Sequence, residues 1–478
     1  MSLHLGTDGW RGLLAEDCTF AEIRGLAKAT ARWLLASAPG PAPRAAVGYD
    51  TRFLSPEFAA AVSEALAQGG IDVLLSDRAL PTPAVSYHVR RLSLSAGVVI
   101  TASHNPALYN GYKIKAAFGG SAPPEMYEAV AREVGRSAPE SARRGRIETL
   151  DLYTPYRVRL AALADLPAIR SAGLRVLADA MHGAAGLLIA EVAGGGSTRV
   201  IPLHANRDPL FGGVHPEPIG PNLAEAAERV RAEGLDLAVA TDGDADRLGV
   251  LDRRGEFVSP HRVLALLLLH AFRRRGLSGG IARTFSTSLL IDRVAAALGS
   301  PVFETPIGFK HVAERMNRGE VVAGGEESGG YAFAFHLPER DGVVAALLLL
   351  ESLAQSGRDL EGALDELERE FGSFAYGRRD VYLPVPVIRA FVEEARSAPP
   401  DRVAGEAVTD VRDLDGVKYV FGDRGWLLHR LSGTEPMIRI YCEHEHEETL
   451  RRALDFAEKR LASFAAERGV EPRRHLSP

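Results

Sequence analysis

The sequence predicts an α/β protein with three similar α/β domains followed by a smaller α+β domain. At 478 residues the chain is too long for one hydrophobic core, since domains hold roughly 150 residues each. A short apolar strand runs into a polar loop three times, after residues 96–100, 235–240 and 320–323. Strand-like and helical segments alternate through these three units, whereas the pattern after Gly372 is typical of α+β structure.

The first domain is expected to alternate helices and strands. Helical periodicity, strand-like runs and proline breaks give its elements in order: a helix at 20–35, a strand at 45–49, a helix ending near 68, a helix after Pro81 and Pro83, and a strand at 96–100. The last of these strands is apolar throughout, which is typical of a buried strand in a parallel sheet. The polar, unpatterned stretch at 136–146 is expected to be a linker.

The second and third domains repeat this alternation of strands and helices, whereas the last domain does not. Their expected elements are strands at 174–178, 235–240, 281–284 and 320–323, a helix at 288–298, and, in the last domain, strands at 379–385 and 418–421 with helices at 389–396 and 448–464. The apolar runs at 263–269 and 343–350 are expected to be core helices, because a membrane span needs ~20 residues. The predicted domains are 1–148, 149–255, 256–370 and 371–478.

Composition and charge exclude several classes of protein. Hydrophobic residues make up 46% of the chain and charged residues 25%, as in ordinary globular proteins. A formal net charge of −6 argues against nucleic-acid binding, which needs a basic surface. Two cysteines, Cys18 and Cys442, and an N-terminus without signal-peptide character fit a reducing compartment. We therefore expect a cytoplasmic protein with no nucleic-acid or membrane partner.

The loop Thr101-Ala102-Ser103-His104-Asn105-Pro106 follows the strand at 96–100. Loops at the carboxyl ends of parallel strands bind ligands in open α/β folds, and Ser103 at the tip of this loop is a candidate nucleophile. The alternative is an ordinary strand-to-helix turn whose serine and asparagine cap backbone groups. Because a serine does not attack unaided, a partner for Ser103 must come from elsewhere in the chain.

Asp242, Asp244 and Asp246 place three carboxylates at alternate positions after the strand at 235–240. Like charges this close repel one another unless a cation lies between them, and oxygen ligands select Mg²⁺ or Ca²⁺. An EF-hand is excluded, because Arg247 and Arg253 stand where its loop needs glycine and glutamate. The alternative is an acidic turn that caps a helix. As Mg²⁺ ligands, the three aspartates would leave room for a phosphate oxygen.

Two further loops carry side chains suited to sugar phosphates. Arg430-Leu431-Ser432-Gly433-Thr434-Glu435-Pro436 could clamp a phosphate with its guanidinium, hydroxyl and backbone N–H groups, and Arg439 returns near the same edge. Glu326 and Ser328 lie between glycine pairs, so the backbone could approach a sugar closely while the side chains bind its hydroxyls. Taken alone, the first of these loops is also ordinary turn chemistry.

Two basic residues extend the candidate site. Arg11 ends a glycine-rich opening and could bind a phosphate with both arms of its guanidinium, although such openings are more often plain turns. Lys113 follows Ser103 by ten residues and is by default a surface lysine. If the fold places it beside Ser103 with arginines nearby to depress its pKa, it could exchange a proton with a substrate hydroxyl.

These four loops, in this order and at these separations, resemble the signature loops of the α-D-phosphohexomutase superfamily. The resemblance spans almost the whole chain, with one loop per domain. It implies three similar mixed-sheet α/β domains and a C-terminal α+β domain around one central cleft, with Ser103 as the phosphoserine. The site residues that it implies are the Mg²⁺ ligands Asp242, Asp244, Asp246 and Ser103, the catalytic group Lys113, His104, Arg247 and Arg11, the sugar-binding Glu326 and Ser328, and the phosphate-binding Arg430, Ser432, Gly433 and Thr434.

The reaction that the resemblance implies moves a phosphoryl group between O1 and O6 of a hexose phosphate. Phosphorylated Ser103 would give its phosphoryl group to the free hydroxyl and so form a hexose 1,6-bisphosphate, which is also the expected activator. This intermediate would reverse its orientation in the cleft and return its other phosphoryl group to Ser103. The loops at 305–310, with Lys310, and at 325–329 are similar to those of glucose-preferring members. Phosphoglucomutase is therefore the expected activity, with one Mg²⁺ per chain and a monomer or homodimer as the expected assembly. Phosphomannomutase and phosphoglucosamine mutase are the alternatives within the superfamily, and a Mg²⁺-dependent sugar phosphatase is the alternative of another class.

Overall fold

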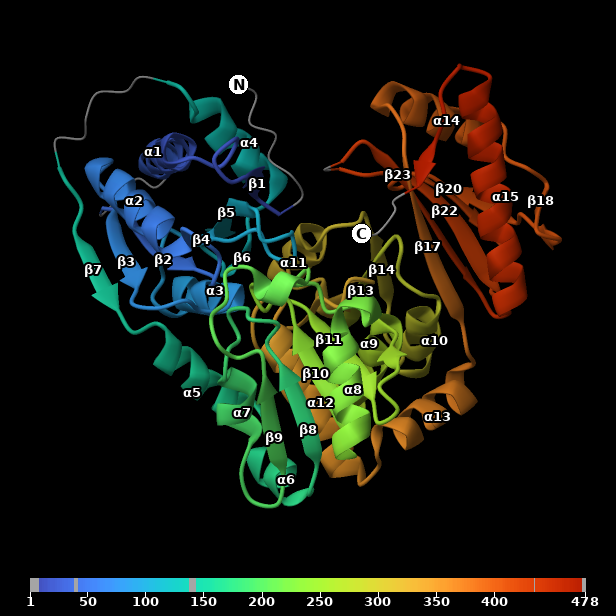
Figure 1. Cartoon of the computed structure of the whole chain (residues 1–478), viewed down its shortest axis with the longest axis horizontal. Helices are drawn as coiled ribbons and strands as arrows, with labels where there is room; N and C mark the ends of the chain where they lie inside the picture. Colours follow the sequence, from blue (N-terminus) through green and yellow to red (C-terminus); the bar gives the residue numbers. More distant parts are fainter. Residues whose placement is uncertain (1–7, 38–41, 137–142, 434, 475–478) are drawn as a thin grey trace.

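Four β-sheets of four or more strands, each with its own helices, follow one another along the described part of the chain. The computed structural model describes residues 8–37, 42–136, 143–433 and 435–474. Figure 1 shows the first and last domains on opposite sides of the molecule, with the second and third domains below and between them. The predicted class, three mixed-sheet α/β domains followed by an α+β domain, is confirmed.

The first domain is a mixed sheet with helices on both faces. Its elements are β1 (Trp10–Leu13), α1 (Phe20–Ser37), β2 (Arg44–Tyr49), α2 (Ser55–Gln68), β3 (Asp72–Ser76), α3 (Thr82–Arg91), β4 (Ala96–Ile100), β5 (Tyr109–Ala116), β6 (Gly120–Ser121), α4 (Pro124–Glu133) and β7 (Ile147–Leu150). The strand order is β1-β5-β4-β2-β3-β7, with β6 paired to β5. Helices α1, α2 and α4 share one core with this sheet, whereas α3 packs into the core of the second and third domains.

Strand β7 corrects the predicted end of the first domain. It pairs in parallel with β3 through Leu150, so the predicted boundary after residue 148 falls inside a strand of the first sheet. The predicted linker at 136–146 lies partly outside the described residues. Its described end is held on the first domain, because Arg143 forms an ion pair with Asp72 and Arg144 with Glu64.

The second and third domains are smaller mixed sheets. The second contains α5 (Tyr153–Leu163), α6 (Leu166–Ser171), β8 (Arg175–Asp179), α7 (Leu188–Ala193), β9 (Arg199–Leu203), α8 (Ala224–Glu233), β10 (Leu237–Thr241), β11 (Leu248–Asp252) and β12 (Phe257–Val258). The third contains α9 (Pro260–Arg273), β13 (Gly280–Thr284), α10 (Leu290–Ala297), β14 (Val302–Thr305), α11 (Phe309–Asn317), β15 (Val321–Gly325), β16 (Tyr331–Phe333), α12 (Gly342–Ser356) and α13 (Leu360–Phe371). Because β12 pairs with β11, the second sheet extends beyond the predicted boundary after residue 255.

The three polar loops share one position in their sheets. Each joins a parallel strand to an antiparallel neighbour: β4 to β5, β10 to β11, and β15 to β16. The alternative of a strand-to-helix turn for the loop at 101–106 is therefore wrong, because the chain turns back into the sheet after Pro106. A hairpin connection holds a loop at both ends, so the side chains at its tip are fixed relative to the sheet.

The fourth domain is an antiparallel sheet covered by two helices. It contains β17 (Ala375–Tyr382), α14 (Val385–Ser397), β18 (Arg402–Val403), β19 (Glu406–Ala407), β20 (Asp410–Arg412), β21 (Val417–Val420), β22 (Gly425–Leu431), β23 (Met437–His444), α15 (Glu447–Ala466) and β24 (Arg473–Arg474). The strand predicted at 379–385 instead begins at Ala375, because β17 pairs with β23 from there. Its predicted end is also wrong, because a helix already begins at Val385, with Pro384 at its N-cap.

The longest apolar runs of the chain lie inside the protein. The runs at 263–269 and 343–350 fall in α9 and α12, whose side chains are mostly buried in the shared core of the first three domains. None of the helices in the described part of the chain combines the length and apolar character needed to cross a membrane.

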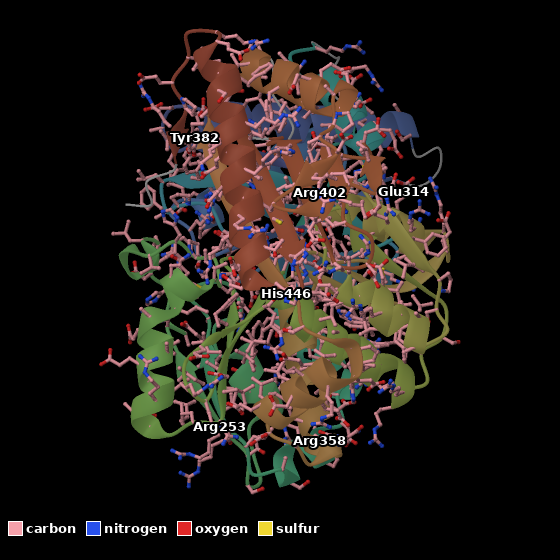
Figure 2. All side chains as sticks on the ribbon, turned by 90° about the vertical axis from the view of Figure 1, so that its right-hand side faces the viewer. Arg253, Glu314, Arg358, Tyr382, Arg402 and His446 are labelled. Atoms are coloured by element: carbon pink, nitrogen blue, oxygen red, sulfur yellow. The ribbon has the colours of Figure 1, made fainter. Side chains whose placement is uncertain are left out.

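Charged side chains cover the outer surface. In Figure 2, Arg253 and Arg358 lie at the lower end of the molecule, where Arg253 pairs with Asp359 and Arg358 with Glu366. Exposed pairs of this kind are worth only about 0–1 kcal/mol each. Buried ion pairs behave differently, and they gather where the polar loops meet.

Candidate active site

Ser103 and Asp242 join the first and second domains at one point. Ser103 Oγ donates a hydrogen bond to Asp242 Oδ2 at 2.9 Å, and both residues are fully buried. Ser103 has a φ of 53°, a left-handed conformation that costs a non-glycine residue about 1–2 kcal/mol. Gly243 allows the loops to approach, since a Cβ built there would lie 2.5 Å from the Ser103 carbonyl oxygen. The candidate nucleophile and the acidic loop therefore pack as one unit.

The three aspartates form a compact buried cluster. One oxygen from each carboxylate lies within 4.8 Å of the others. Asp242 Oδ1 accepts hydrogen bonds from the backbone N–H groups of Asp246 and Arg247, while Oδ1 of Asp244 and Oδ1 of Asp246 are buried with no hydrogen-bond partner among the described residues. Burial, with the charges of Asp246 and Asp244, raises the pKa of Asp242 well above its ordinary value. Orphaned carboxylate oxygens and like-charge repulsion fit a divalent cation with oxygen ligands.

Lys113 lies on β5 against this cluster. Its Nζ is 2.8 Å from Asp244 Oδ2, 2.9 Å from Asp8 Oδ2 and 3.3 Å from Asp246 Oδ2. Burial lowers the pKa of Lys113, but the carboxylates outweigh burial and raise it above its ordinary value. The condition set for proton exchange, a pKa of Lys113 depressed by nearby arginines, is therefore not met, and the surface position expected by default is not found either, because Lys113 is fully buried. The three carboxylates therefore favour the ammonium form of Lys113.

The loop at 325–329 in the third domain, which is predicted to bind the sugar and is called the sugar loop below, is held by Arg340. The guanidinium donates to Glu326 Oε2 at 2.9 Å, to Asp246 Oδ2 at 2.6 Å and to Asp8 Oδ2 at 2.7 Å. Gly330 makes room for it, since a Cβ built there would lie 2.2 Å from Arg340 Cδ. Arg340 thus ties the first, second and third domains together with buried ion pairs.

Glu326 and Ser328, the two residues of this loop that are predicted to bind the sugar, differ in their surroundings. Burial raises the pKa of Glu326, an effect that Arg340 counters. Ser328 is half-buried at the tip of the loop, beside Gly329 with its φ of 85°. Glu327 turns toward Thr284, whose Oγ1 donates to it at 3.2 Å. Glu326 and Ser328 therefore remain the polar groups of this loop that suit a sugar.

Arg11, His104 and Arg247 border the Ser103 loop. Arg11 Nη1 donates a hydrogen bond to Asn105 Oδ1. His104 Nδ1 lies 3.4 Å from Ser103 Oγ, and burial with the charges of Arg247 and Arg11 lowers the pKa of His104 well below its usual value. Arg247 forms an ion pair with Glu217 at 3.6 Å. Two guanidiniums and a neutral imidazole beside one serine suit an anion such as a phosphoryl group.

The predicted phosphate clamp lies where β22 and β23, the two central strands of the fourth sheet, are joined. Arg430 on β22 and Arg439 on β23 are cross-strand partners, and Arg430 Nε pairs with Asp415 Oδ2 at 2.9 Å. Ser432 is buried and Gly433 is exposed, whereas Thr434 lies outside the described residues.

Two electrostatic contacts connect the clamp to the rest of the site. Lys310 is half-buried, and its pKa is lowered mainly by burial, with the charges of Asp415 and Arg430 acting on it in opposite directions. The positive charge of Arg439 also helps to lower the pKa of His104. The geometry agrees for Lys310, because the backbone N–H of Ile307 in the loop predicted at 305–310 donates to Asp415 Oδ2 at 2.9 Å, the carboxylate that pairs with Arg430.

Comparison with known proteins decides the family. Four models of phosphoglucomutase/phosphomannomutase domains match in chain order: alpha/beta/alpha domain I at 2–140, domain II at 154–255, domain III at 259–371 and the C-terminal domain at 388–459. The chain belongs to the phosphoglucomutase/phosphomannomutase family. Members of this family are phosphohexomutases, so the chain is an intramolecular phosphotransferase.

The alignments with similar proteins extend over nearly the full length of this phosphohexomutase. A phosphoglucomutase/phosphomannomutase of Thermococcus kodakarensis is 33% identical over 465 residues, which are 95% of this chain and 98% of the relative. A phosphoglucosamine mutase of Rubrobacter xylanophilus is 34% identical over 464 residues, 95% of this chain and 96% of the relative. The crystal structure of a putative phosphomannomutase from Thermus thermophilus is 38% identical, covers 96% of this chain and 99% of that one, and has a TM-score of 0.84.

Three residues of the phosphohexomutase site are not predicted from the sequence. Arg340 has a weak signal, because the charged triplet Glu339-Arg340-Asp341 stands directly before an apolar helix. Asp8 lies in the glycine-rich opening, and nothing in that opening singles out its contacts with Lys113 and Arg340. Arg52 follows the strand β2 and reaches under the Ser103 loop. Asp8 and Arg340 meet across domains, and Arg52 contacts Ser103 over a separation of 51 residues within the first domain; spacing along the chain reveals neither.

Proposed function

We propose that this phosphohexomutase carries the phosphoryl group on Ser103 and moves it between two hydroxyls of a hexose. The observation that carries the proposal is the 2.9 Å hydrogen bond from Ser103 Oγ to Asp242, beside the unpartnered oxygens of Asp244 and Asp246. In the first half-reaction the bond between phosphorus and Ser103 Oγ breaks, and a bond forms to a hydroxyl oxygen of the hexose monophosphate. After the bisphosphate turns over, its other phosphoryl group returns to Ser103, so phosphoryl groups balance over the cycle.

The side chains around Ser103 suit phosphoryl transfer, which needs positioning and charge neutralisation. The three aspartates, with Ser103, would hold one Mg²⁺, which supplies charge neutralisation at the phosphoryl oxygens. Arg247 and Arg11 would bind those oxygens, and the His104 imidazole would donate or accept a hydrogen bond there. The proton of the attacking sugar hydroxyl would pass to Ser103 Oγ as this oxygen leaves the phosphoryl group, and Lys113, whose Nζ lies 2.8 Å from Asp244 Oδ2, would relay it.

The remaining predicted residues would hold the substrate. Glu326 and Ser328 would bind sugar hydroxyls, which both orientations of a hexose present to them. The phosphate that is not reacting would bind at the clamp, which comprises Arg430, Ser432, Gly433, Arg439 and Lys310, together with the predicted Thr434. Two arginines placed directly opposite each other support an anion at this position.

The preferred sugar is proposed from the names of the relatives. Several similar proteins are named phosphoglucosamine mutase, one is named phosphoglucomutase/phosphomannomutase, and one similar structure is that of a putative phosphomannomutase. These names support the alternatives, mannose or glucosamine phosphates, better than the glucose preference predicted from the loops. We therefore propose that mannose 1-phosphate or glucosamine 1-phosphate is used faster than glucose 1-phosphate, with the matching 1,6-bisphosphate as activator. The monomer or homodimer and the cytoplasmic location stay predictions.

A serine variant tests the proposal. Ser103→Ala removes the phosphoryl carrier and should abolish isomerisation, whereas Ser63→Ala removes an equally buried serine that only donates to Ala59 within α2 and should leave it intact. Intact mass of the wild-type protein incubated with bisphosphate should show one added phosphoryl group, and peptide mapping should place it on Ser103. Retained activity in Ser103→Ala would reject Ser103 as carrier.

Coupled assays with mannose, glucosamine and glucose 1-phosphates rank the substrates in the same preparation. Release of inorganic phosphate in place of the isomer would show a sugar phosphatase. A faster reaction with glucose 1-phosphate than with the other two would reject the proposed sugar preference and leave the role of Ser103 untouched.

A further inference from the structure

Arg52 lies fully buried beneath the loop that carries Ser103. Its Nη2 donates to the carbonyl oxygens of Ser103 and Asn105, each at 2.6 Å. Its Nη1 donates to the carbonyl oxygens of Pro106 at 2.9 Å and Tyr109 at 3.1 Å. One guanidinium therefore gathers four backbone carbonyls of a single loop.

The guanidinium is itself fixed from two sides. Asp50 Oδ2 forms a buried ion pair with Arg52 Nε at 3.2 Å, and Asp50 Oδ1 accepts from the Arg52 N–H and from Ser55 Oγ. The ring of Phe211, from the second domain, lies with its centroid 4.8 Å from the guanidinium carbon. A guanidinium held by four carbonyls, a carboxylate and an aromatic ring cannot change its direction without breaking several of these contacts at once.

The loop above Arg52 needs such support. Ser103 stands in a left-handed backbone conformation, and its carbonyl is pressed between Arg52 and Gly243 of the acidic loop. Without the guanidinium, the buried carbonyl of Ser103 and the half-buried carbonyls of Asn105, Pro106 and Tyr109 would lose these hydrogen bonds, which is unfavourable wherever water does not replace them. The backbone would then turn to satisfy them, and Ser103 Oγ would leave its place beside Asp242.

We infer that Arg52 is a positioning residue for phosphoryl transfer. It holds the Ser103 backbone in the conformation that aims Oγ at the acidic cluster, and it acts through the loop without touching the sugar phosphate. The inference rests on the proposed role of Ser103 as phosphoryl carrier. Its consequence is specific: losing Arg52 should slow the chemical step and leave substrate binding at the sugar loop and the clamp unchanged.

Lysine at this position separates positioning from charge. Arg52→Lys keeps one positive charge, but an ammonium has no planar fork that could bind four carbonyls at once. The matched control is Arg283→Lys, which alters another buried arginine that pairs with Asp292 and Glu304 in the third domain, away from the Ser103 loop. Both variants lose buried contacts, so a loss of stability alone should affect them equally.

The experiment measures kcat, KM and thermal unfolding for the wild-type protein and both variants, with the bisphosphate present. For Arg52→Lys we expect kcat to fall roughly 100-fold, because small misplacements of reacting groups have effects of this order, while KM stays within a factor of about three. Amide hydrogen exchange should become faster at 101–109 in this variant. Arg283→Lys should keep kcat within a factor of about three of the wild-type value.

Each outcome has one meaning. Equal kcat in Arg52→Lys and Arg283→Lys would overturn the inference about Arg52, and so would a rise in KM that accounts for the whole loss of kcat/KM in Arg52→Lys. In either case a phosphorylated Ser103 in the wild-type protein would still support the proposed function. A wild-type protein that never carries a phosphoryl group on Ser103 would reject both the inference about Arg52 and the proposed function. If Arg52→Lys does not fold, Asp50→Asn loosens the same guanidinium; a kcat at least tenfold below wild type at constant KM supports the inference, and an unchanged kcat rejects it.

Discussion

Arg430 and Arg439 face each other across the two central strands of the fourth sheet, β22 and β23. Like charges directly opposite on a sheet destabilise it by up to about 1 kcal/mol. Asp415 at 2.9 Å from Arg430 and Glu435 at 3.7 Å from Arg439 offset part of this cost, and an anion bound between the two arginines would offset more. Arg439→Gln should therefore raise KM for a hexose 1-phosphate about tenfold or more and leave the free energy of unfolding unchanged or slightly higher. Steady-state kinetics and urea unfolding measure both quantities.

The control for this prediction lies on the same sheet. Arg412→Gln removes a partly exposed arginine of β20 that pairs with Asp410 and Glu304, and it should leave KM unchanged. Equal KM values for Arg439→Gln and the wild-type protein would show that the fourth sheet does not bind the substrate phosphate.

Arg340 offers a second prediction, on stability. Arg340→Met leaves the carboxylates of Asp8, Asp246 and Glu326 without their shared partner in a buried place, and removing one member of a buried ion pair costs about 3–5 kcal/mol. Arg358→Met breaks an exposed pair with Glu366 and should cost about 1 kcal/mol or less. Urea unfolding compares the two variants, and similar losses would mean that Arg340 does not join the domains as its contacts indicate.

The positions of the three α/β loops could be predicted because each follows an apolar strand that reads clearly in the sequence. The antiparallel strand after each loop could not, since β5 mixes polar and apolar residues: Asn110, Lys113 and Lys115 are buried there by partners in other parts of the chain. The resemblance to a known superfamily supplied the roles of the residues, which the spacing alone left open.

The electrostatics of the site could not be predicted for the same reason. The pKa of Lys113 depends on Asp244 and Asp246 in the second domain, which lie more than a hundred residues away in sequence. Arg340 contacts Asp246 over a separation of 94 residues. Sequence patterns indicate local structure, so they do not predict contacts between charged side chains that meet only when the domains pack together.

The ion pairs of Glu351 make the free energy of unfolding depend on pH. This buried carboxylate accepts from His270 at 2.8 Å and from Arg275 at 2.6 Å; burial opposes ionisation, but these partners lower the pKa of Glu351 from 4.5 to about 2. Its contribution, about 3 kcal/mol, is fully present above pH 4.5 and is lost as the pH falls toward 2. Glu351→Gln should therefore destabilise the protein strongly at pH 7 and progressively less between pH 4.5 and pH 3, as measured by urea unfolding.

An exposed glutamate gives the matched comparison for the pH prediction. Glu448→Gln, on the outer face of α15, should change the free energy of unfolding by about 0.5 kcal/mol or less at every pH. A difference between Glu351→Gln and the wild-type protein that stays constant from pH 7 to pH 3 would mean that the Glu351 pairs do not shift its titration.

The acidic cluster predicts a thermal effect of Mg²⁺ that does not depend on turnover. Three buried carboxylates destabilise one another in the metal-free protein, so Mg²⁺ added after chelation should stabilise the fold by about 2.7 kcal/mol at a concentration of ~100 Kd and raise Tm. Asp244→Asn should abolish most of this rise. Glu256→Gln alters an exposed acidic residue at the start of β12 in the same domain and should keep it. A Tm of the wild-type protein that does not respond to Mg²⁺ would mean that Lys113 and Arg340 already neutralise the cluster, and the aspartates would then serve to anchor those two cations.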